Sequence, residues 1–192
     1  MRSLVISSSL DAQSRSERLA EMYGRALTAR GAQARVLSLK DHVLPRFDNG
    51  AGIGVDPMYR LLHDAVSAAD GLVLASPIYN WGCCAELKRF VEVLGTTPPD
   101  GSLRSPFFDK VITFVNAAGL PHSYMAFAPM AVSMMLDFKC VINLYHVYVH
   151  NRHWAGDALD DEASQRLDQS AGVMAELMRC LSERNYRSTW SI

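Results

Sequence analysis

The sequence predicts an α/β fold in which helices cover both faces of a five-stranded parallel sheet. Three observations lead to this prediction. Short apolar runs alternate along the chain with longer segments whose apolar residues recur at helical spacing. The short runs are nearly continuous in apolar character, as expected of parallel strands that are buried on both faces. Alternating strands and helices are typical of a parallel sheet with helices packed on each side.

The expected elements follow one another without an internal repeat, a low-complexity tract or a candidate domain boundary. The first helix ends at Gly31, a residue typical of a helix C-cap. The second begins at Pro57, which suits a first helical turn, and the fourth contains Pro129, which fits only in a first turn or at a kink. We expect strands over residues 4–7, 34–39, 72–75, 111–115 and 140–146, and helices over residues 16–30, 57–69, 84–94, 123–137 and 161–184.

The composition is that of a globular protein, with 192 residues of which 49% are hydrophobic and 20% are charged. A chain of this length buries enough surface to fold without disulfides or a structural metal. The formal net charge of -1, without a basic cluster, argues against a nucleic-acid partner. No apolar run is long enough for a signal-peptide core or a membrane span. We therefore expect one domain over residues 1–192, in a cytoplasmic protein without a membrane partner.

The four cysteines, Cys83, Cys84, Cys140 and Cys180, have no C-x-x-C spacing and no accompanying histidine cluster. No metal site is therefore predicted. The vicinal pair Cys83-Cys84 is compatible with redox activity. The interpretation that we favour is that both are small apolar residues at a helix start in a reducing compartment.

Three serines, Ser9, Ser14 and Ser16, lie between the first strand and the first helix. Their hydroxyls and the backbone N–H groups of a helix N-terminus can bind a phosphate. The segment is neither a Walker A sequence nor a G-x-G-x-x-G fingerprint, which disfavours a triphosphate or a dinucleotide here. Neutral donors suit a monophosphate such as that of FMN. Serines also cap helices, and for one serine capping would be the better explanation, but the three together favour a phosphate site.

A second candidate segment follows the third strand and contains Pro77, Ile78, Tyr79, Asn80 and Trp81. A flat aromatic ligand needs a rigid wall and partners for its polar edge. The proline stiffens the turn, the two aromatic rings offer faces or edges, and backbone amides can meet the pyrimidine ring of a flavin. The asparagine can add a side-chain amide or brace the turn. Taken alone, this segment is also compatible with an ordinary loop.

A third candidate segment follows the fourth strand and contains Asn116, Ala118 and Gly119. Small residues at this position allow the backbone to approach a ligand closely, and the asparagine can add a polar contact. A plain strand-to-helix connection explains this segment equally well. Ligands of parallel α/β sheets bind beyond the carboxyl ends of the strands, where we expect the three segments to meet.

Together the three segments resemble the NADPH-dependent FMN reductases and the related flavodoxin-like quinone reductases and azoreductases. The first motif of that family, G-S-x-R-x-x-S-x-N-x-x-L-A, is similar in register to residues 8–20. Its second motif, P-x-Y-N followed by L-K in a helix, is matched by residues 77–80 and by Leu87-Lys88. The likeness extends from Leu4 to about Ile142. Asp11 stands where the family often has arginine, and so brings a negative charge to the expected phosphate site.

The resemblance implies a flavodoxin-like three-layer sandwich with strand order 2-1-3-4-5. It implies that the three segments hold FMN, and that a hydride passes from NADPH or NADH through FMN to a small-molecule electron acceptor such as a flavin, a quinone or an azo compound. Members are commonly homodimers or homotetramers. The helix carrying Met125, Met130, Met134 and Met135 fits either such an interface or the core.

No catalytic residue is predicted, because cofactor chemistry needs none and the six histidines form no obvious dyad. His122 and His153 are the histidines that could line a site. Two alternatives to an enzyme stay open. The chain could be a flavin-binding electron carrier or redox sensor that is reduced by a partner protein. It could also be an interaction module that has lost its flavin, an idea motivated by Asp11 and by the few glycines of the third segment.

Overall fold

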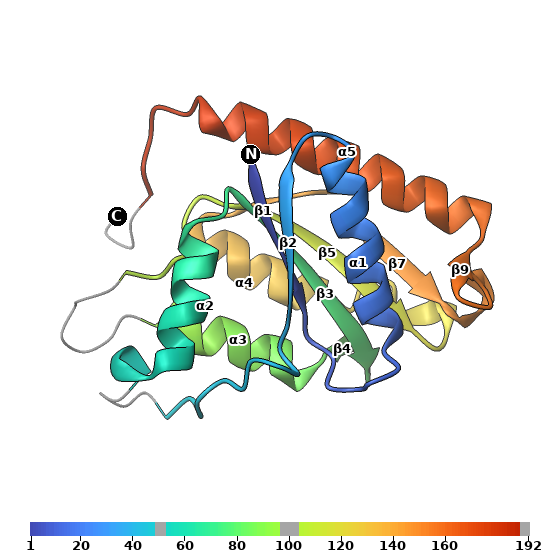
Figure 1. Cartoon of the computed structure of the whole chain (residues 1–192), viewed down its shortest axis with the longest axis horizontal. Coiled ribbons are helices and arrows are strands. Elements are labelled where there is room, and N and C mark those ends of the chain that lie inside the picture. The colour runs from blue at the N-terminus through green and yellow to red at the C-terminus, as the bar shows by residue number, and fades with distance from the viewer. Residues whose placement is uncertain (49–52, 97–103, 189–192) are drawn as a thin grey trace.

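A mostly parallel sheet runs through the centre of the protein (Figure 1). The structure is a computed structural model, and it describes residues 1–48, 53–96 and 104–188. The strands of the sheet pair in the order β2-β1-β3-β5-β6, with β7 also pairing with β5, which confirms the parallel sheet and its predicted order 2-1-3-4-5. Their bounds are β1 Arg2–Ser7, β2 Gln33–Ser38, β3 Gly71–Tyr79, β5 Val111–Ala118, β6 Val141–Ile142 and β7 Val147–His150.

Helices cover both faces of the sheet and make it the middle of three layers (Figure 1). One face is covered by α1 (Arg15–Thr28) and α5 (Asp161–Ser182), and the other by α2 (Pro57–Ser67), α3 (Ala85–Gly95) and α4 (Ala128–Phe138). The remaining elements are short: the 3-10 helices η1 Ile53–Val55, η2 Pro121–Ser123 and η3 Asn151–His153, the strand β4 Gly82–Cys83, and a hairpin of β8 Trp154–Ala155 and β9 Ala158–Leu159.

Side-chain size differs between the two faces of the sheet. In β1, Leu4 and Ile6 pack toward α2, α3 and α4, whereas Val5 packs toward α1 and α5. The same alternation of larger and smaller side chains recurs in β3 and β5. On the face with the smaller residues α5 comes very close, since a Cβ on Gly71 would lie 2.8 Å from the sulfur of Met178. The size pattern of the strands therefore sets how closely each helical layer approaches.

A buried polar cluster joins α1, β5 and α5. The Tyr23 hydroxyl is hydrogen-bonded to Ser170 Oγ at 2.9 Å, and the amide of Asn143 donates to Thr113 Oγ1 at 3.1 Å and to Ser170 O at 3.0 Å. Burial raises the pKa of Tyr23 to about 12. Because buried polar groups are expensive unless they are paired, this cluster fixes how the helices sit on the sheet.

The prediction of one fifth strand over residues 140–146 is wrong. The chain forms two short strands, β6 and β7, which pair with the beginning and the end of β5. Between them Asn143 turns inward into the buried cluster, and its Oδ1 accepts the N–H of Tyr145 at 3.0 Å. Leu144 is consequently turned out to solvent, with an exposed fraction of 86%. Satisfying a buried amide thus interrupts what reads as one apolar strand.

Four other boundaries differ from the expected ones. Strands β3 and β5 run beyond residues 75 and 115, because residues 76 and 77 continue to pair with residues 116 and 117. The fourth helix starts at Ala128 instead of residue 123, which puts Pro129 in its first turn. The cap of the first helix is Ala29, and Gly31 follows with a positive φ of 80°. The segment between the third helix and the fourth strand contains Pro98 and Pro99, which lie outside the described residues.

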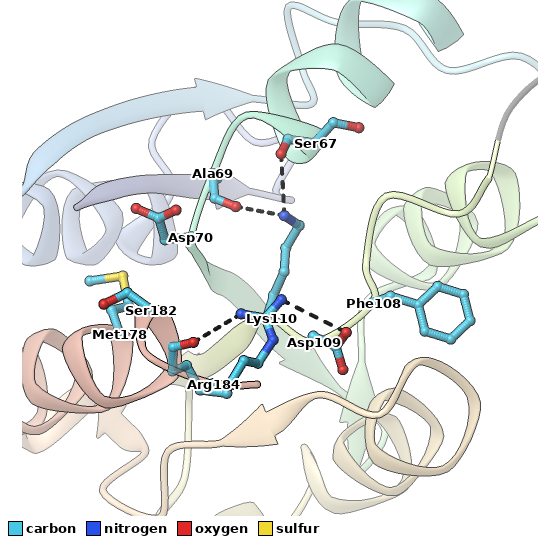
Figure 2. Close-up of a pocket in the computed structure, with 10 residues that line it drawn as sticks. Ser67, Ala69, Asp70, Phe108, Asp109, Lys110, Met178, Ser182 and Arg184 are labelled. Carbon is cyan, nitrogen blue, oxygen red and sulfur yellow. Dashed lines mark hydrogen bonds and ion pairs between the residues drawn. The ribbon is translucent and has the colours of Figure 1, made fainter. Parts of the chain in front are cut away.

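Lys110 lines a cavity of about 200 Å³ at the amino ends of the strands, opposite to the edge where the three loops after β1, β3 and β5 lie. Figure 2 shows its amine reaching the carbonyls that end α2, with distances of 2.5 Å to Ala69 O and 3.5 Å to Ser67 O. Burial lowers the pKa of the Lys110 amine to about 8, although the charge of Asp70 acts in the opposite direction. The side chain therefore has a structural role, closing the end of a helix.

We expect the protein to gain stability between pH 8 and 10.5 relative to the variant Lys110→Met. In this interval the unfolded lysine, with its ordinary pKa of 10.5, binds more protons than the folded one. The free energy of unfolding should therefore rise with pH by up to about 1.4 kcal/mol per pH unit more than in the variant. Urea unfolding of both proteins at pH 7.5 and 9.5 measures this difference, and parallel pH profiles would contradict it.

Candidate functional site

The loops that follow β1, β3 and β5 meet at the carboxyl edge of the sheet and form two adjoining pockets. The serine pocket, about 270 Å³, is lined by Ser9, Ser14 and Ser16 together with part of the second and third loops. The tryptophan pocket, about 330 Å³, is lined by Trp81 and by residues of the same two loops. Of the eleven residues predicted from the sequence, ten line these pockets: Ser9, Ser14, Ser16, Pro77, Ile78, Tyr79, Asn80, Trp81, Ala118 and Gly119.

The three serines of the first loop are buried and hydrogen-bonded. Ser14 is the N-cap of α1, and its Oγ accepts the N–H of Glu17 at 3.2 Å and lies 2.8 Å from Ser16 Oγ. Ser9 Oγ accepts the N–H of Asp11 at 3.2 Å. Ser14 thus has the capping role considered above, and it lines the pocket as well. The helix N-terminus and its serines form a neutral donor set suited to an anion.

The carboxylate of Asp11 is engaged within its own loop. Its Oδ1 accepts the N–H of Gln13 at 2.9 Å, and both residues line the serine pocket. This local turn is typical of aspartate in loops. It gives the carboxylate a partner but leaves its negative charge at the wall of the pocket.

The turn expected after the third strand is a tight hairpin in the structure. Strand β3 continues to Tyr79 and pairs with the short antiparallel strand β4. The two residues between them, Asn80 and Trp81, have positive φ angles of 49° and 63°, as a two-residue hairpin of the primed type requires. The left-handed conformation is unusual for tryptophan. It presents the indole of Trp81, 67% exposed, at the wall of the tryptophan pocket.

Cys83 is the last residue of β4 in this hairpin, and Cys84 directly follows it. The backbone N–H of Cys84 donates to Ser76 Oγ at 3.1 Å, and its buried sulfur lies 3.1 Å from Ser8 Oγ. Burial raises the pKa of the Cys83 thiol to about 11, so this sulfur is not a thiolate at neutral pH. All four cysteines are free. Cys84 therefore ties the first loop to the second.

Asn116 does not line either pocket. It is 1% exposed and lies within the sheet, where its amide donates to Ser76 O at 3.4 Å and its Oδ1 has no hydrogen-bond partner. Ala118 and Gly119, at the end of the same strand, line both pockets. A Cβ added to Gly119 would meet no atom within 4 Å, so open space lies beside this backbone.

Sequence reasoning missed Arg15 and Asn151, which line the serine pocket. Asn151 begins η3 directly after β7, and its Oδ1 accepts a hydrogen bond from Arg15. The pairing of β7 with β5 brings it to the site, a contact that no local pattern reveals. His122 lines the tryptophan pocket, whereas His153 lies outside both pockets and pairs with Asp160 at 3.2 Å.

Within the described residues, no group of histidine, cysteine and carboxylate side chains could hold a metal ion. No helix there is long and apolar enough to cross a membrane.

Residues 1–153 match the family model of the NADPH-dependent FMN reductases. The chain belongs to this family. It is therefore a flavin-dependent oxidoreductase of a family that uses FMN together with a reduced nicotinamide dinucleotide. A search of curated proteins finds no matching sequence.

Solved structures similar to this FMN reductase family member share its flavodoxin-like fold. The apo form of the NADH:FMN oxidoreductase EMOB is 19% identical, with a TM-score of 0.73 over 96% of this chain and 91% of that one. FerB of Paracoccus denitrificans, described as an NAD(P)H:(acceptor) oxidoreductase, is 14% identical, with a TM-score of 0.77 over 93% and 97%. RosB with bound 8-demethyl-8-formylriboflavin-5'-phosphate is 16% identical, with a TM-score of 0.76 over 97% and 82%.

The residues of the site fit FMN. Buried serine hydroxyls and the first turn of α1 suit a phosphate, while the hairpin and the free space beside Gly119 suit a flat ring system. The charge of Asp11 is the one feature that opposes a phosphate, and Arg15 lies in the same pocket.

We expect the variant Gly119→Leu to fold normally but to bind FMN at least tenfold more weakly. Gly119 has no positive φ and a Cβ there meets no neighbour, so the new side chain fits the fold. It occupies space beside the two pockets that the residue lines. Thermal unfolding checks the fold and fluorescence titration measures the affinity. Gly119→Ala should have a smaller effect, and tight FMN binding by the leucine variant would show that the ring lies elsewhere.

Proposed function

We propose that the protein is an FMN-dependent NAD(P)H oxidoreductase that passes a hydride from the nicotinamide through FMN to a flavin, a quinone or a similar small acceptor. The observation that carries this proposal is the meeting of the three loops in two adjoining pockets at the carboxyl edge of the sheet. The chain acts as one flavin-binding domain over its 192 residues.

The two pockets have different tasks in this proposal. Ser9, Ser14 and Ser16 bind the phosphate in the serine pocket, and the hairpin of β3 and β4 with Ala118 and Gly119 holds the ring. The bound flavin supplies the hydride chemistry, accepting two electrons from one substrate and giving them to the next. The protein binds and orients, so none of its side chains needs to exchange a proton with the reacting atoms.

The tryptophan pocket is the proposed place for the nicotinamide and then for the acceptor. It adjoins the serine pocket through Ile78, Ala118 and Gly119, which line both. Tyr79 and Trp81 are 59% and 67% exposed at this edge and can stack on an aromatic substrate. An open aromatic site of this kind accepts several flat acceptors, which supports a broad substrate class.

A homodimer or homotetramer is part of the proposal. The methionines of the α4 region divide between two roles: Met130 and Met134 are buried in the core, whereas Met125 and Met135 are exposed. The outer side of α4 also exposes Val132 and Leu136. These exposed apolar side chains supply a surface suited to self-association.

The decisive experiment is an anaerobic titration of the purified protein. FMN is added first and the visible spectrum recorded, and NADPH and NADH are then added separately. We expect FMN to bind and its absorbance to bleach with at least one nicotinamide. Binding without bleaching would favour the electron carrier or redox sensor instead. Failure to bind FMN would favour the other alternative, an interaction module that has lost its flavin.

We expect Ser14→Asp to weaken FMN binding strongly, by about tenfold or more, and Ser14→Asn to weaken it much less. Aspartate and asparagine are both good N-cap residues, so each variant keeps an acceptor for the N–H of Glu17. Only aspartate adds a negative charge next to the phosphate. Fluorescence titration with FMN compares the two, and equal affinities would show that the phosphate does not lie at Ser14.

A further inference from the structure

We propose that Arg15 is the residue by which this protein selects a phosphorylated flavin, and that Asn151 and Trp154 hold its guanidinium in place for this task. The proposal rests on the proposed function, because it concerns the phosphate of the same flavin. Arg15 supplies the positive charge of a site whose other phosphate-binding groups, the three serine hydroxyls, are neutral.

Arg15 is the first residue of α1 and lies between the buried serines Ser14 and Ser16. All three line the serine pocket. The guanidinium of Arg15 is held by two contacts on the segment after β7. It donates to Asn151 Oδ1, and it lies over the indole of Trp154, 5.6 Å from the ring centroid. An arginine with such partners loses less freedom when it binds an anion than one in open solvent does.

The charged residues that line the serine pocket indicate why a cation is needed at this position. Among the described residues that line the serine pocket, Asp11 and Arg15 are the charged ones. Without Arg15 the pocket would be negative, and a phosphate monoester, which carries up to two negative charges, would be repelled. With Arg15 the lining is neutral overall and presents guanidinium donors, whose hydrogen bonds to phosphate are stronger than those of neutral groups.

The place of Arg15 on its helix supports the same role. A cation at the first position of a helix faces the positive end of the helix dipole, which is unfavourable. An anion bound at that end would interact favourably with both the dipole and the arginine. Asn151 and Trp154 hold the guanidinium beside the serine pocket, which Arg15 lines together with Ser14 and Ser16.

Arg18 provides a matched control on the next turn of α1. It pairs with Asp157 in the hairpin of β8 and β9, and it does not line the serine pocket. Both arginines thus connect α1 to the segment after β7, but only Arg15 combines that contact with the pocket. Comparing the two separates a phosphate contact from a contact that merely holds the hairpin.

The experiment compares FMN with riboflavin, which differ only in the phosphate, by flavin fluorescence titration at low salt. In Arg15→Gln we expect the affinity for FMN to fall about tenfold and the affinity for riboflavin to stay unchanged. Arg18→Gln should leave both affinities as they are. Asp11→Asn, which keeps the acceptor for the Gln13 N–H, should strengthen FMN binding and leave riboflavin binding unchanged.

Two results would overturn the inference while leaving the flavin site intact. Equal losses for FMN and riboflavin in Arg15→Gln would show that the residue only holds the structure. Unchanged FMN binding in that variant would show that neutral donors suffice. If the wild-type protein binds neither flavin, the proposed function itself fails and this inference fails with it.

Discussion

The pairing of β3 with β5 beyond the hydrophobic core is the interaction on which the site depends. Both strands continue past Ala75 and Val115, so that Ser76 pairs with Asn116 and Pro77 with Ala117. The Asn116 amide adds a bond to Ser76 O inside the sheet. The second and third loops therefore leave the sheet side by side and at the same level. Losing this pairing would separate two walls of the site while leaving the core largely unchanged.

The first loop is tied to the same point by small side chains. The N–H and the hydroxyl of Ser8 both donate to Ala75 O, each at 2.9 Å, and the sulfur of Cys84 contacts the same serine. Ser76 Oγ in turn accepts the N–H of Cys84. All these residues are buried. The three loops are thus joined by a hydrogen-bonded layer at the ends of the strands, and binding residues placed on such a layer are held more rigidly than residues on free loops.

The sequence is sufficient to predict the architecture, because burial on both faces and helical spacing are local patterns. The same holds for most of the site. In a parallel sheet the loops after neighbouring strands must meet at one edge, so residues such as Ser9, Tyr79 and Gly119 could be grouped without knowing any distance. The prediction of the fifth strand was wrong because that segment depends on partners far away in the chain. The fifth strand breaks because Asn143 finds Thr113 and Ser170, and nothing near residue 143 signals that.

Arg15 and Asn116 illustrate the same limit at the site itself. The polar residue after the fourth strand looks suited to a ligand, yet Asn116 is used within the sheet. Arg15 precedes the helix predicted over residues 16–30, and only its contact with Asn151, 136 positions away, indicates a role at the site. Local sequence shows that a polar group is present, whereas tertiary contacts decide whether it points at a ligand or at the protein.

At the hairpin of Asn80 and Trp81, the backbone preference of a residue conflicts most clearly with the conformation that it has at the site. A primed turn favours glycine at its second position, and a bulky residue in the left-handed region costs on the order of 1–3 kcal/mol. Trp81 has that conformation and is largely exposed, so burial returns little of this energy. Strain of this kind persists where the surroundings fix the backbone. Here the pairing of β3 with β4 and the bond from Cys84 to Ser76 do so. The fold thus holds an indole at the wall of the pocket, in a place where folding alone would favour glycine.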